Sequence, residues 1–194
     1  RYTERDVNTA QQQDQNFRLL VGEAQRRLGR TLSGEELKTL LALHDFLRLP
    51  TEVIGLLIHY CIQRSRSRGN SRMPSMRAIE KEGYTWAEQG IDTVEAAAGY
   101  MNRNLQQLAA VNRYQSLLGI AQRRLAPGEE RYLQQWAQLR FPDEVITLAY
   151  ERTCLSTGGL KWQYMDAILR RWDEQGLRTI QDIEQKDARP ARNE

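Results

Sequence analysis

Apolar residues recur along this chain every three or four positions, and no segment alternates apolar and polar residues for long. Spacing by three and four places side chains on one face of an α-helix, whereas alternation by two is typical of a β-strand. In residues 14–28, for example, Phe17, Leu20 and Ala24 share one helical face. We therefore predict an all-α fold.

Capping and helix-breaking residues mark where these helices begin and end. Gly29 follows the first apolar run, Ser33 and Glu36 form a capping-box pattern before the second, and Pro50 opens the third. Pro127, Pro142 and Gly176 mark boundaries in the second half. In the first half we predict helices over about 14–28, 33–47 and 50–63, a polar loop over 64–72, and helices over 74–90 and 92–108.

The chain also repeats itself over a long distance. Residues 22–28 read Gly-Glu-Ala-Gln-Arg-Arg-Leu, and residues 119–125 read Gly-Ile-Ala-Gln-Arg-Arg-Leu. The spacing between matched positions falls along the chain: 97 residues at Gly22 and Gly119, 92 at Pro50 and Pro142, and 86 at Trp86 and Trp172. Repetition with shrinking spacing indicates a duplicated domain whose second copy has lost residues between its helices.

The repeat predicts two similar domains of about five helices each, at residues 14–108 and 109–186, with flexible ends at 1–13 and 187–194. Small halves of this size are near the lower range of independent folding. No proline occurs between Asp92 and Leu125. Two arrangements therefore stay open, namely one long helix joining the domains or a break near residues 111–114.

Charge and cysteine content narrow the function without deciding it. The net charge is only +3, but 24 of the 28 basic residues are arginine, which suits phosphate and carboxylate partners. GC-rich codon usage would produce the same excess.

Cys61 and Cys154 lie in apolar helical runs, as expected for reduced, buried cysteines of a cytoplasmic protein. No apolar run is long enough to span a membrane, and the first residues show no signal-peptide pattern.

Patterns for catalysis or metal binding are absent from the sequence. His44 and His59 are the only histidines and have no metal-ligand spacing, and no phosphate loop, dinucleotide fingerprint or nucleophile motif occurs. Acidic pairs such as Glu129 and Glu130 fall in first helical turns, where they stabilise the helix dipole. We therefore expect a non-enzymatic protein with no catalytic residue, no metal and no cofactor.

A resemblance to a known family rests on residues 161–180. Tyr164, Ile168 and Trp172 are four residues apart, and Gly176 and Thr179-Ile180 follow them. This pattern resembles the signature of the C-terminal helical domain of the DnaD family of bacterial primosome proteins. The resemblance covers most of the chain, once over about 17–101 and again over about 114–185.

The two copies match that signature unequally. Ala78 and Glu82 stand where the second copy has Tyr164 and Ile168, so the first copy keeps only the tryptophan and the glycine. Whatever the motif does in the family is therefore assigned to the second copy, where Tyr164, Ile168, Trp172 and Gly176 form it and are in part structural. We expect the first copy to contribute mainly to the structure or to the assembly of the protein.

The resemblance implies a role in initiating or restarting replication in low-GC Gram-positive bacteria or their phages. The implied partners are DNA, single-stranded or duplex and bound with little sequence specificity, and a replication initiator, helicase or helicase loader. Family members usually carry an N-terminal winged-helix domain for homo-oligomerisation, whose pattern these residues do not show. The tail beyond Gln185, with Arg189 and Arg192, would lead into a DNA-binding extension.

The candidate DNA-binding residues form two groups. The predicted loop over 64–72 has the densest positive charge, and it is either a phosphate-contacting loop or a solvated, flexible connection. In the second copy, aromatic residues beside cations would stack on unpaired bases, although a stripe such as Ile168 and Trp172 is also typical of a core. The candidates are Arg64, Arg66, Arg68 and Arg72 in the first group and Lys161, Trp162, Tyr164, Arg170 and Arg171 in the second.

Two functions follow from these observations. The favoured one is a non-enzymatic DNA-binding protein of the primosome, which contacts mainly phosphates. The alternative is a protein-interaction scaffold of the same machinery, whose apolar grooves bind a helicase loader or initiator while its arginines only keep it soluble. The repeated pairs Arg26-Arg27 and Arg123-Arg124 are either exposed helix faces or DNA-backbone contacts, and their repetition does not decide between these.

Overall fold

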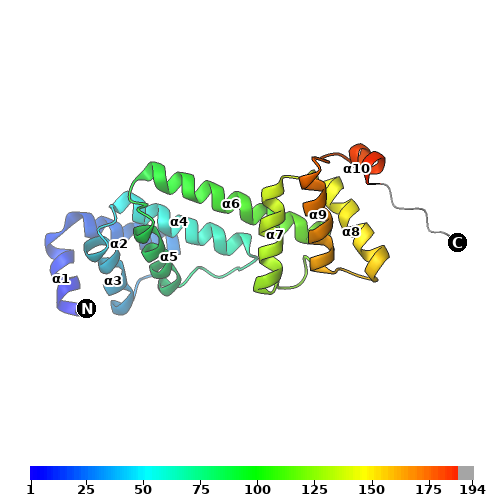
Figure 1. Ribbon diagram of the computed structural model, residues 1–194. Helices are drawn as coiled ribbons and strands as arrows, with labels where there is room; N and C mark the ends of the chain where they lie inside the picture. The colour runs from blue at the N-terminus through cyan, green and yellow to red at the C-terminus, as the bar shows by residue number, and fades with distance from the viewer. Residues whose placement is uncertain (188–194) are drawn as a thin grey trace. The chain divides into compact units, whose positions relative to one another are not determined.

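The computed structural model describes residues 1–187, which form ten α-helices and one π-helical turn with no β-strand among them (Figure 1). The predicted all-α fold is confirmed. The chain divides into two compact units, unit 1 over residues 1–105 and unit 2 over residues 106–194. The predicted boundary, between residues 108 and 109, lies three residues further along the chain.

Unit 1 contains α1 (Glu4–Gln13), α2 (Gln15–Leu28), α3 (Gly34–Leu41), a π-helical turn (Ala42–Phe46), α4 (Thr51–Ser67) and α5 (Met76–Glu88). Helix α6 (Val94–Leu117) begins in unit 1 and ends in unit 2. Unit 2 continues with α7 (Pro127–Leu139), α8 (Asp143–Thr157), α9 (Trp162–Glu174) and α10 (Ile180–Lys186).

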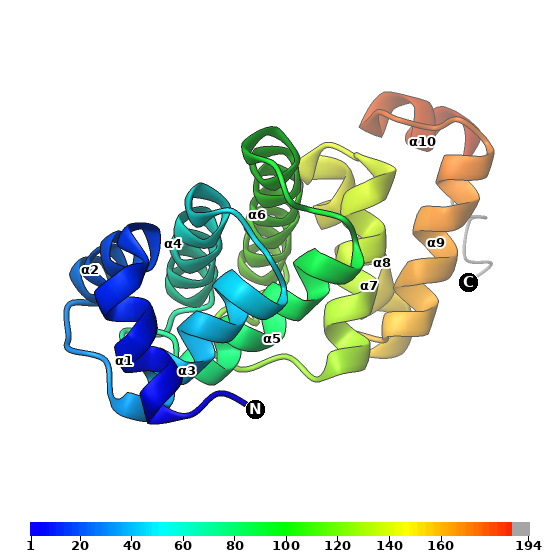
Figure 2. The same cartoon turned by 90° about the vertical axis from the view of Figure 1, so that its left-hand side faces the viewer.

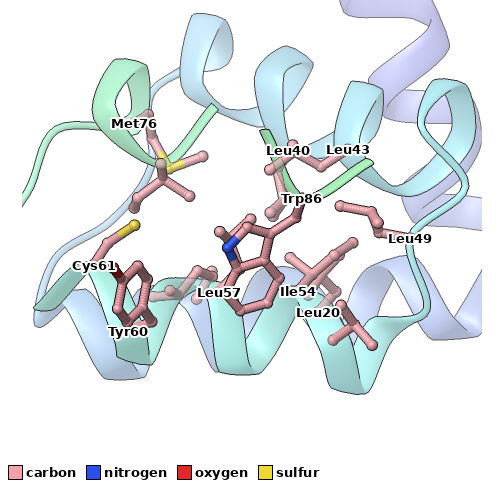
Figure 3. Close-up of a cluster of buried hydrophobic side chains, with 14 of the residues drawn as sticks. Leu20, Leu40, Leu43, Leu49, Ile54, Leu57, Tyr60, Cys61, Met76 and Trp86 are labelled. Atoms are coloured by element: carbon pink, nitrogen blue, oxygen red, sulfur yellow. The ribbon is translucent and has the colours of Figure 1, made fainter. Parts of the chain in front are cut away.

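Two layers of helices enclose the core of unit 1. Figure 2 shows α1, α3 and α5 in one layer and α2, α4 and the start of α6 in the other. Trp86 of α5 is fully buried at the centre, among leucine and isoleucine side chains from α2, α3 and α4 (Figure 3). The labelled neighbours of this tryptophan include Leu20, Leu43, Ile54 and Leu57.

The core of unit 2 is built around α9, which packs against both α7 and α8. Trp136 of α7 and Trp172 of α9 are fully buried in it, and Ile183 of α10 joins them. The amphipathic spacing of apolar residues in each helix accounts for this burial, because residues three and four apart share a face.

Backbone details confirm that the units are copies of one fold. Gly90 and Gly176, which follow α5 and α9, both adopt left-handed conformations, with φ values of 70° and 68°. Thr93 and Thr179 then cap the next helix by accepting a hydrogen bond from the backbone N–H three residues ahead. Both pairs are 86 residues apart, as are Trp86 and Trp172.

The repeated heptapeptide, by contrast, does not mark equivalent positions. Gly22 lies inside α2, whereas Gly119 follows the end of α6 with φ +68°. The equivalent of Gly119 is Gly29, which has the same φ and follows α2. In both units, the residue after this glycine donates a backbone hydrogen bond to a glutamine carbonyl, Gln25 in one and Gln115 in the other. The structural spacing here is therefore 90 residues and not 97.

Several predicted boundaries change in the structure. Helix α6 runs unbroken through residues 111–114, which settles the choice between one helix and two, and it ends at Leu117. Residues 4–13 form α1, with Val7 buried against the core, so the prediction of a flexible N-terminal end is wrong there. At the other end, Asp187 is ordered as the C-cap of α10. The rest of the predicted flexible end, with Arg189 and Arg192, lies outside the described residues.

Candidate nucleic-acid interface

The arginine-rich stretch of unit 1 is partly helical. Helix α4 continues to Ser67, so Arg64 and Arg66 lie in its last turns, and the prediction of a loop beginning at residue 64 is wrong. The true connection is short, turns at Gly69 with φ +79°, and leads to Ser75, which caps α5. Between Glu52 and Glu80 the chain contains no acidic residue at all. This acid-free stretch is the feature that concentrates positive charge in unit 1.

Arg64 differs from the other candidates because it faces inward. Its Nη1 donates to Oε2 of Glu82 at 2.7 Å, and its guanidinium lies over the Tyr60 ring, 5.2 Å from the centroid. Only 24 % of its side chain is exposed. Arg64 therefore neutralises a buried carboxylate, and this contact occupies the face that a phosphate would need.

Glu82 is the centre of a buried polar network in unit 1. Its Oε1 accepts hydrogen bonds from Trp86 Nε1 at 3.1 Å and from the Tyr100 hydroxyl at 2.8 Å. Burial, together with the hydrogen bond to Glu82, raises the pKa of Tyr100. Sequence reasoning missed this network, since Arg64 and Tyr100 are each 18 residues from Glu82 in the chain.

The other arginines of the stretch are exposed to solvent. Arg66, Arg68 and Arg72 are all exposed, and so is Arg77 in the first turn of α5, which sequence reasoning did not include. The side chains of Arg66, Arg72 and Arg77 form no ion pair with any residue in 1–187. The signal that could have found Arg77 is the acid-free stretch, which extends past the predicted loop into α5.

The aromatic candidates of unit 2 occupy different environments. Tyr164 is 42 % exposed, and Lys161 beside it is exposed as well. Trp162 is half-buried, because its ring stacks on Tyr132 at 5.9 Å and on Trp136 at 5.6 Å between centroids. Part of the Trp162 surface and much of the Tyr164 ring therefore remain exposed.

The remaining motif residues are structural. Ile168 and Trp172 are buried in the core of unit 2, so this part of the apolar stripe belongs to the core. Gly176 supplies the left-handed turn after α9, a conformation that costs side-chain-bearing residues free energy. The motif therefore contributes one exposed side chain, Tyr164, and three residues that hold the fold.

Both candidate arginines of α9 are engaged by carboxylates. Arg170 Nε donates to Asp166 at 2.8 Å, and its Nη2 donates to Gln135 at 3.0 Å. Arg171 Nη2 donates to Oδ2 of Asp187 at 2.8 Å. About half of each arginine side chain is nonetheless exposed. Both carry charge at the surface, but that charge is largely balanced locally.

The repeated arginine pairs take different structures. Arg26 and Arg27 lie in α2, whereas Arg123 and Arg124 lie in the connection before α7. Arg123 forms a two-point ion pair with Glu129, at 2.8 and 2.6 Å. These hydrogen bonds outweigh burial and lower the pKa of Glu129 to about 2. The structure thus places only the first pair on a helix.

Clusters of metal-ligating side chains and membrane-crossing helices were both sought among residues 1–187. Within residues 1–187, no three His, Cys, Asp or Glu side chains gather closely enough to hold a metal ion. None of the helices over the same residues is both long enough and apolar enough to cross a membrane. Cys61 is buried and Cys154 is half-buried, and both thiols are free.

Comparison with known families gives one match. A family model described as replication initiation and membrane attachment matches residues 22–100 and, a second time, residues 116–187. The first match falls within unit 1 and the second within unit 2. Neither a curated protein nor a solved structure matches the chain.

Proposed function

The chain belongs to the replication initiation and membrane attachment family of DnaD-like domains, and on that basis we propose that it is a non-enzymatic DNA-binding protein of replication. The two tandem family matches confirm the resemblance drawn from the sequence. Binding is expected to depend chiefly on phosphate contacts from the exposed arginines of unit 1. The expected partners are DNA and the proteins that initiate replication or load a helicase.

The observation that carries this proposal is the acid-free stretch of unit 1. Four exposed arginines, from Arg66 to Arg77, follow one another over the end of α4, the connection and the start of α5. Arginine binds phosphate through its planar, multiply donating guanidinium. Contacts of this kind are independent of base sequence and release counterions, so they predict weakly specific, salt-sensitive binding.

Unit 2 supports the proposal in a different way. The half-buried Trp162 and the exposed Tyr164 follow Lys161 by one and three residues in the chain, and aromatic residues beside a cation are suited to stacking on unpaired bases. Arg170 and Arg171 contribute less, because Asp166 and Asp187 already bind them. We therefore expect unit 1 to supply most of the salt dependence and unit 2 to favour single-stranded over duplex DNA.

The test is a salt titration with two charge-matched variants. One replaces Arg66, Arg68, Arg72 and Arg77 by alanine, and the control replaces four exposed arginines elsewhere, namely Arg1, Arg5, Arg103 and Arg131. The affinity for labelled DNA is measured at several salt concentrations. Each lost phosphate contact lowers the slope of log K against log salt by about 0.7 to 0.9. With four contacts removed, we expect the first variant to lose about 3 units of slope and the control less than about 1.

Two results would count against DNA binding through this surface. Equal losses in both variants would show that only net charge matters. No salt-sensitive binding by the unmodified protein would favour the alternative, a protein-interaction scaffold in the same machinery. Arg64 is left out of the variant because its loss would strand the buried Glu82 carboxylate and confuse unfolding with lost binding.

A further inference from the structure

One face of α5 presents two cations and an aromatic ring to solvent. Arg77, Lys81 and Tyr84 follow one another at spacings of four and three residues, so they lie on the same face of the helix. All three are exposed, and Tyr84 is 39 % exposed. We call these three residues the α5 stripe. It extends about 10 Å along the helix axis, at about 1.5 Å per residue.

The opposite face of the same helix belongs to the core of unit 1. Ile79, Gly83 and Trp86 are buried there, which leaves the α5 stripe on the solvent side. A single exposed aromatic residue is common on protein surfaces and indicates no function by itself. Here the ring instead continues a cationic surface, because the acid-free stretch ends within α5 and Arg77 belongs to both.

The three side chains of the stripe have no partner within residues 1–187. Neither Arg77 nor Lys81 forms an ion pair there, and the Tyr84 side chain makes no hydrogen bond or ring contact. Acidic residues limit the stripe, since the half-buried Glu80 lies beside it and the exposed Glu88 follows Tyr84 by one turn. Two uncompensated cations and a free aromatic ring therefore share one helix face.

The corresponding face of unit 2 is different. At a spacing of 86 residues, Gln163, Ala167 and Arg170 occupy the equivalent positions. Arg170 is the single cation among them, and a carboxylate already binds it. The exposed ring of unit 2, Tyr164, corresponds instead to Ala78. The α5 stripe is therefore a feature of unit 1 and not a requirement of the repeated fold.

We propose that the α5 stripe binds single-stranded DNA, with Tyr84 stacked on a base and Arg77 and Lys81 in contact with the phosphates beside it. The inference rests on the proposed function and deepens it, because it assigns to unit 1 a contact that duplex DNA cannot make. Bases of a duplex are stacked on both faces, whereas an unpaired base offers a face to an aromatic ring. A stacked strand rises about 3.4 Å per nucleotide, so the stripe covers about three nucleotides.

The affinities for a labelled single strand and for the duplex of the same sequence test the stacking contact. Tyr84→Ala should weaken binding of the single strand at least about fivefold and change duplex affinity less than about twofold. Because stacking releases no counterions, the slope of log K against log salt should stay the same. Tyr84→Phe keeps the ring and should bind like the unmodified protein. An equal loss for both DNA forms, or a loss in Tyr84→Phe as large as in Tyr84→Ala, would overturn the proposal.

The phosphate contacts are tested at Lys81, since Arg77 is already replaced in the four-arginine variant. Lys81→Ala should lower the salt slope by about 0.7 for the single strand and about 0.9 for the duplex. Arg5→Ala removes the same charge from an exposed position of α1 and should lower it much less. Lys81 thus affects both DNA forms, whereas Tyr84 affects one. Equal slopes for Lys81→Ala and Arg5→Ala would refute the cationic part of the stripe.

The variants should fold, because Tyr84 and Lys81 are exposed. Their melting temperatures should lie within about 3 °C of that of the unmodified protein. If Tyr84→Ala is less stable than this, Tyr84→Leu retains an apolar side chain on the helix without an aromatic ring. It should show the same selective loss of single-strand affinity, and no loss there would overturn the inference.

The outcomes separate this inference from the proposed function. If the four-arginine variant loses salt-sensitive DNA binding while every Tyr84 variant binds like the unmodified protein, the inference fails and the proposed function stands. No DNA binding by the unmodified protein overturns both. An aromatic ring beside cations also suits an anionic membrane surface. If Tyr84→Ala loses binding to vesicles of equal parts phosphatidylserine and phosphatidylcholine but keeps its single-strand affinity, the stripe is a lipid contact and the inference is wrong.

Discussion

A leucine and a small residue exchange places between the two units beside the central tryptophan. A Cβ atom on Gly83 would lie 2.5 Å from Leu43 Cδ2 and 3.2 Å from Leu57 Cδ2, so these side chains fill the space above the glycine. At the equivalent positions unit 2 has Leu169 opposite Ala149. The large residue of the pair is therefore on α4 in unit 1 and on α9 in unit 2.

This exchange predicts how paired substitutions behave. Gly83→Leu alone overpacks the core of unit 1 and should destabilise the protein by about 1 to 3 kcal/mol. Leu57→Ala alone leaves a cavity and should cost about 2 to 5 kcal/mol. The double variant has the residue types of unit 2 at these two positions. It relieves the contact with residue 57 but not the closer one with Leu43, so it should cost less than the sum by about 1 kcal/mol. Urea unfolding of all four proteins measures the coupling, and strictly additive costs would contradict it.

At the same scale, sequence alone identified some residues and not others. The helical spacing correctly placed Phe17, Ile168 and Trp172 in apolar faces, because burial follows a local period. It could not show that Arg64 is neutralised by Glu82, since nothing local links residues 18 positions apart. The sequence pattern of a run of arginines is the same whether their side chains face solvent or a buried carboxylate.

At the scale of elements, the π-helical turn marks where unit 1 has one residue more than unit 2. Ser33 caps the helix that leads into this turn, and Glu36 and Glu129 occupy the same capping position 93 residues apart. Arg48 and Arg140, both with positive φ, end the two segments 92 residues apart. Unit 1 therefore has one residue more between these points. A wider π turn accommodates one extra residue without rotating the flanking positions.

Removing that residue should restore an α-helical register. Phe46 is 65 % exposed and lies at the end of the π turn, so its deletion loses little burial and brings Leu47 to the spacing found in unit 2. We expect a cost of no more than about 1 to 2 kcal/mol, within the common range for single changes. Deleting Gln63 from α4 is the control, because it rotates Arg64 away from Glu82 and should cost considerably more. Similar costs for both deletions, by urea unfolding, would argue against the insertion.

The repeated heptapeptide shows why element boundaries were harder to predict than elements. Its Gln-Arg-Arg segment is helical at residues 25–27 and non-helical at 122–124, although the residues are identical. Gly119 ends the helix in unit 2, and the following residues are held by the pair of Arg123 with Glu129. Sequence identity over seven residues was therefore weaker evidence of equivalence than the position of a left-handed glycine.

At the scale of the whole molecule, the same ion pair occurs in both units, where it joins a connection to the helix that follows it, α3 in unit 1 and α7 in unit 2. Arg30 binds Glu36 in unit 1 and Arg123 binds Glu129 in unit 2, at 2.7 and 2.6 Å, and each pair is six residues apart. Burial opposes ionisation of Glu36, but hydrogen bonds from Ser33 and Arg30 outweigh it and lower the pKa. Both units therefore depend on a carboxylate that stays ionised in the folded state.

This shared feature predicts a loss of stability in acid. A carboxyl group whose pKa is lowered by folding stabilises the protein fully above its unfolded pKa, and that contribution disappears as the pH falls towards the folded pKa. For Glu129 the window runs from 4.5 down to about 2. The melting temperature should therefore be steady above about pH 5 and fall steeply below about pH 4.

Substitution at the two glutamates distinguishes this cause from general acid unfolding. Glu129→Gln keeps an acceptor for the backbone of Ala126 but loses the ion pair, so its melting temperature at pH 7 should be lower and its drop between pH 5 and pH 3 smaller than in the unmodified protein. Glu36→Gln should behave alike, since unit 1 uses the same pair. Glu144→Gln, at an exposed carboxylate, serves as the control. If all three variants kept the pH profile of the unmodified protein, neither ion pair would be a source of its acid sensitivity, and the resemblance between the two connections would be one of geometry without a shared energetic role.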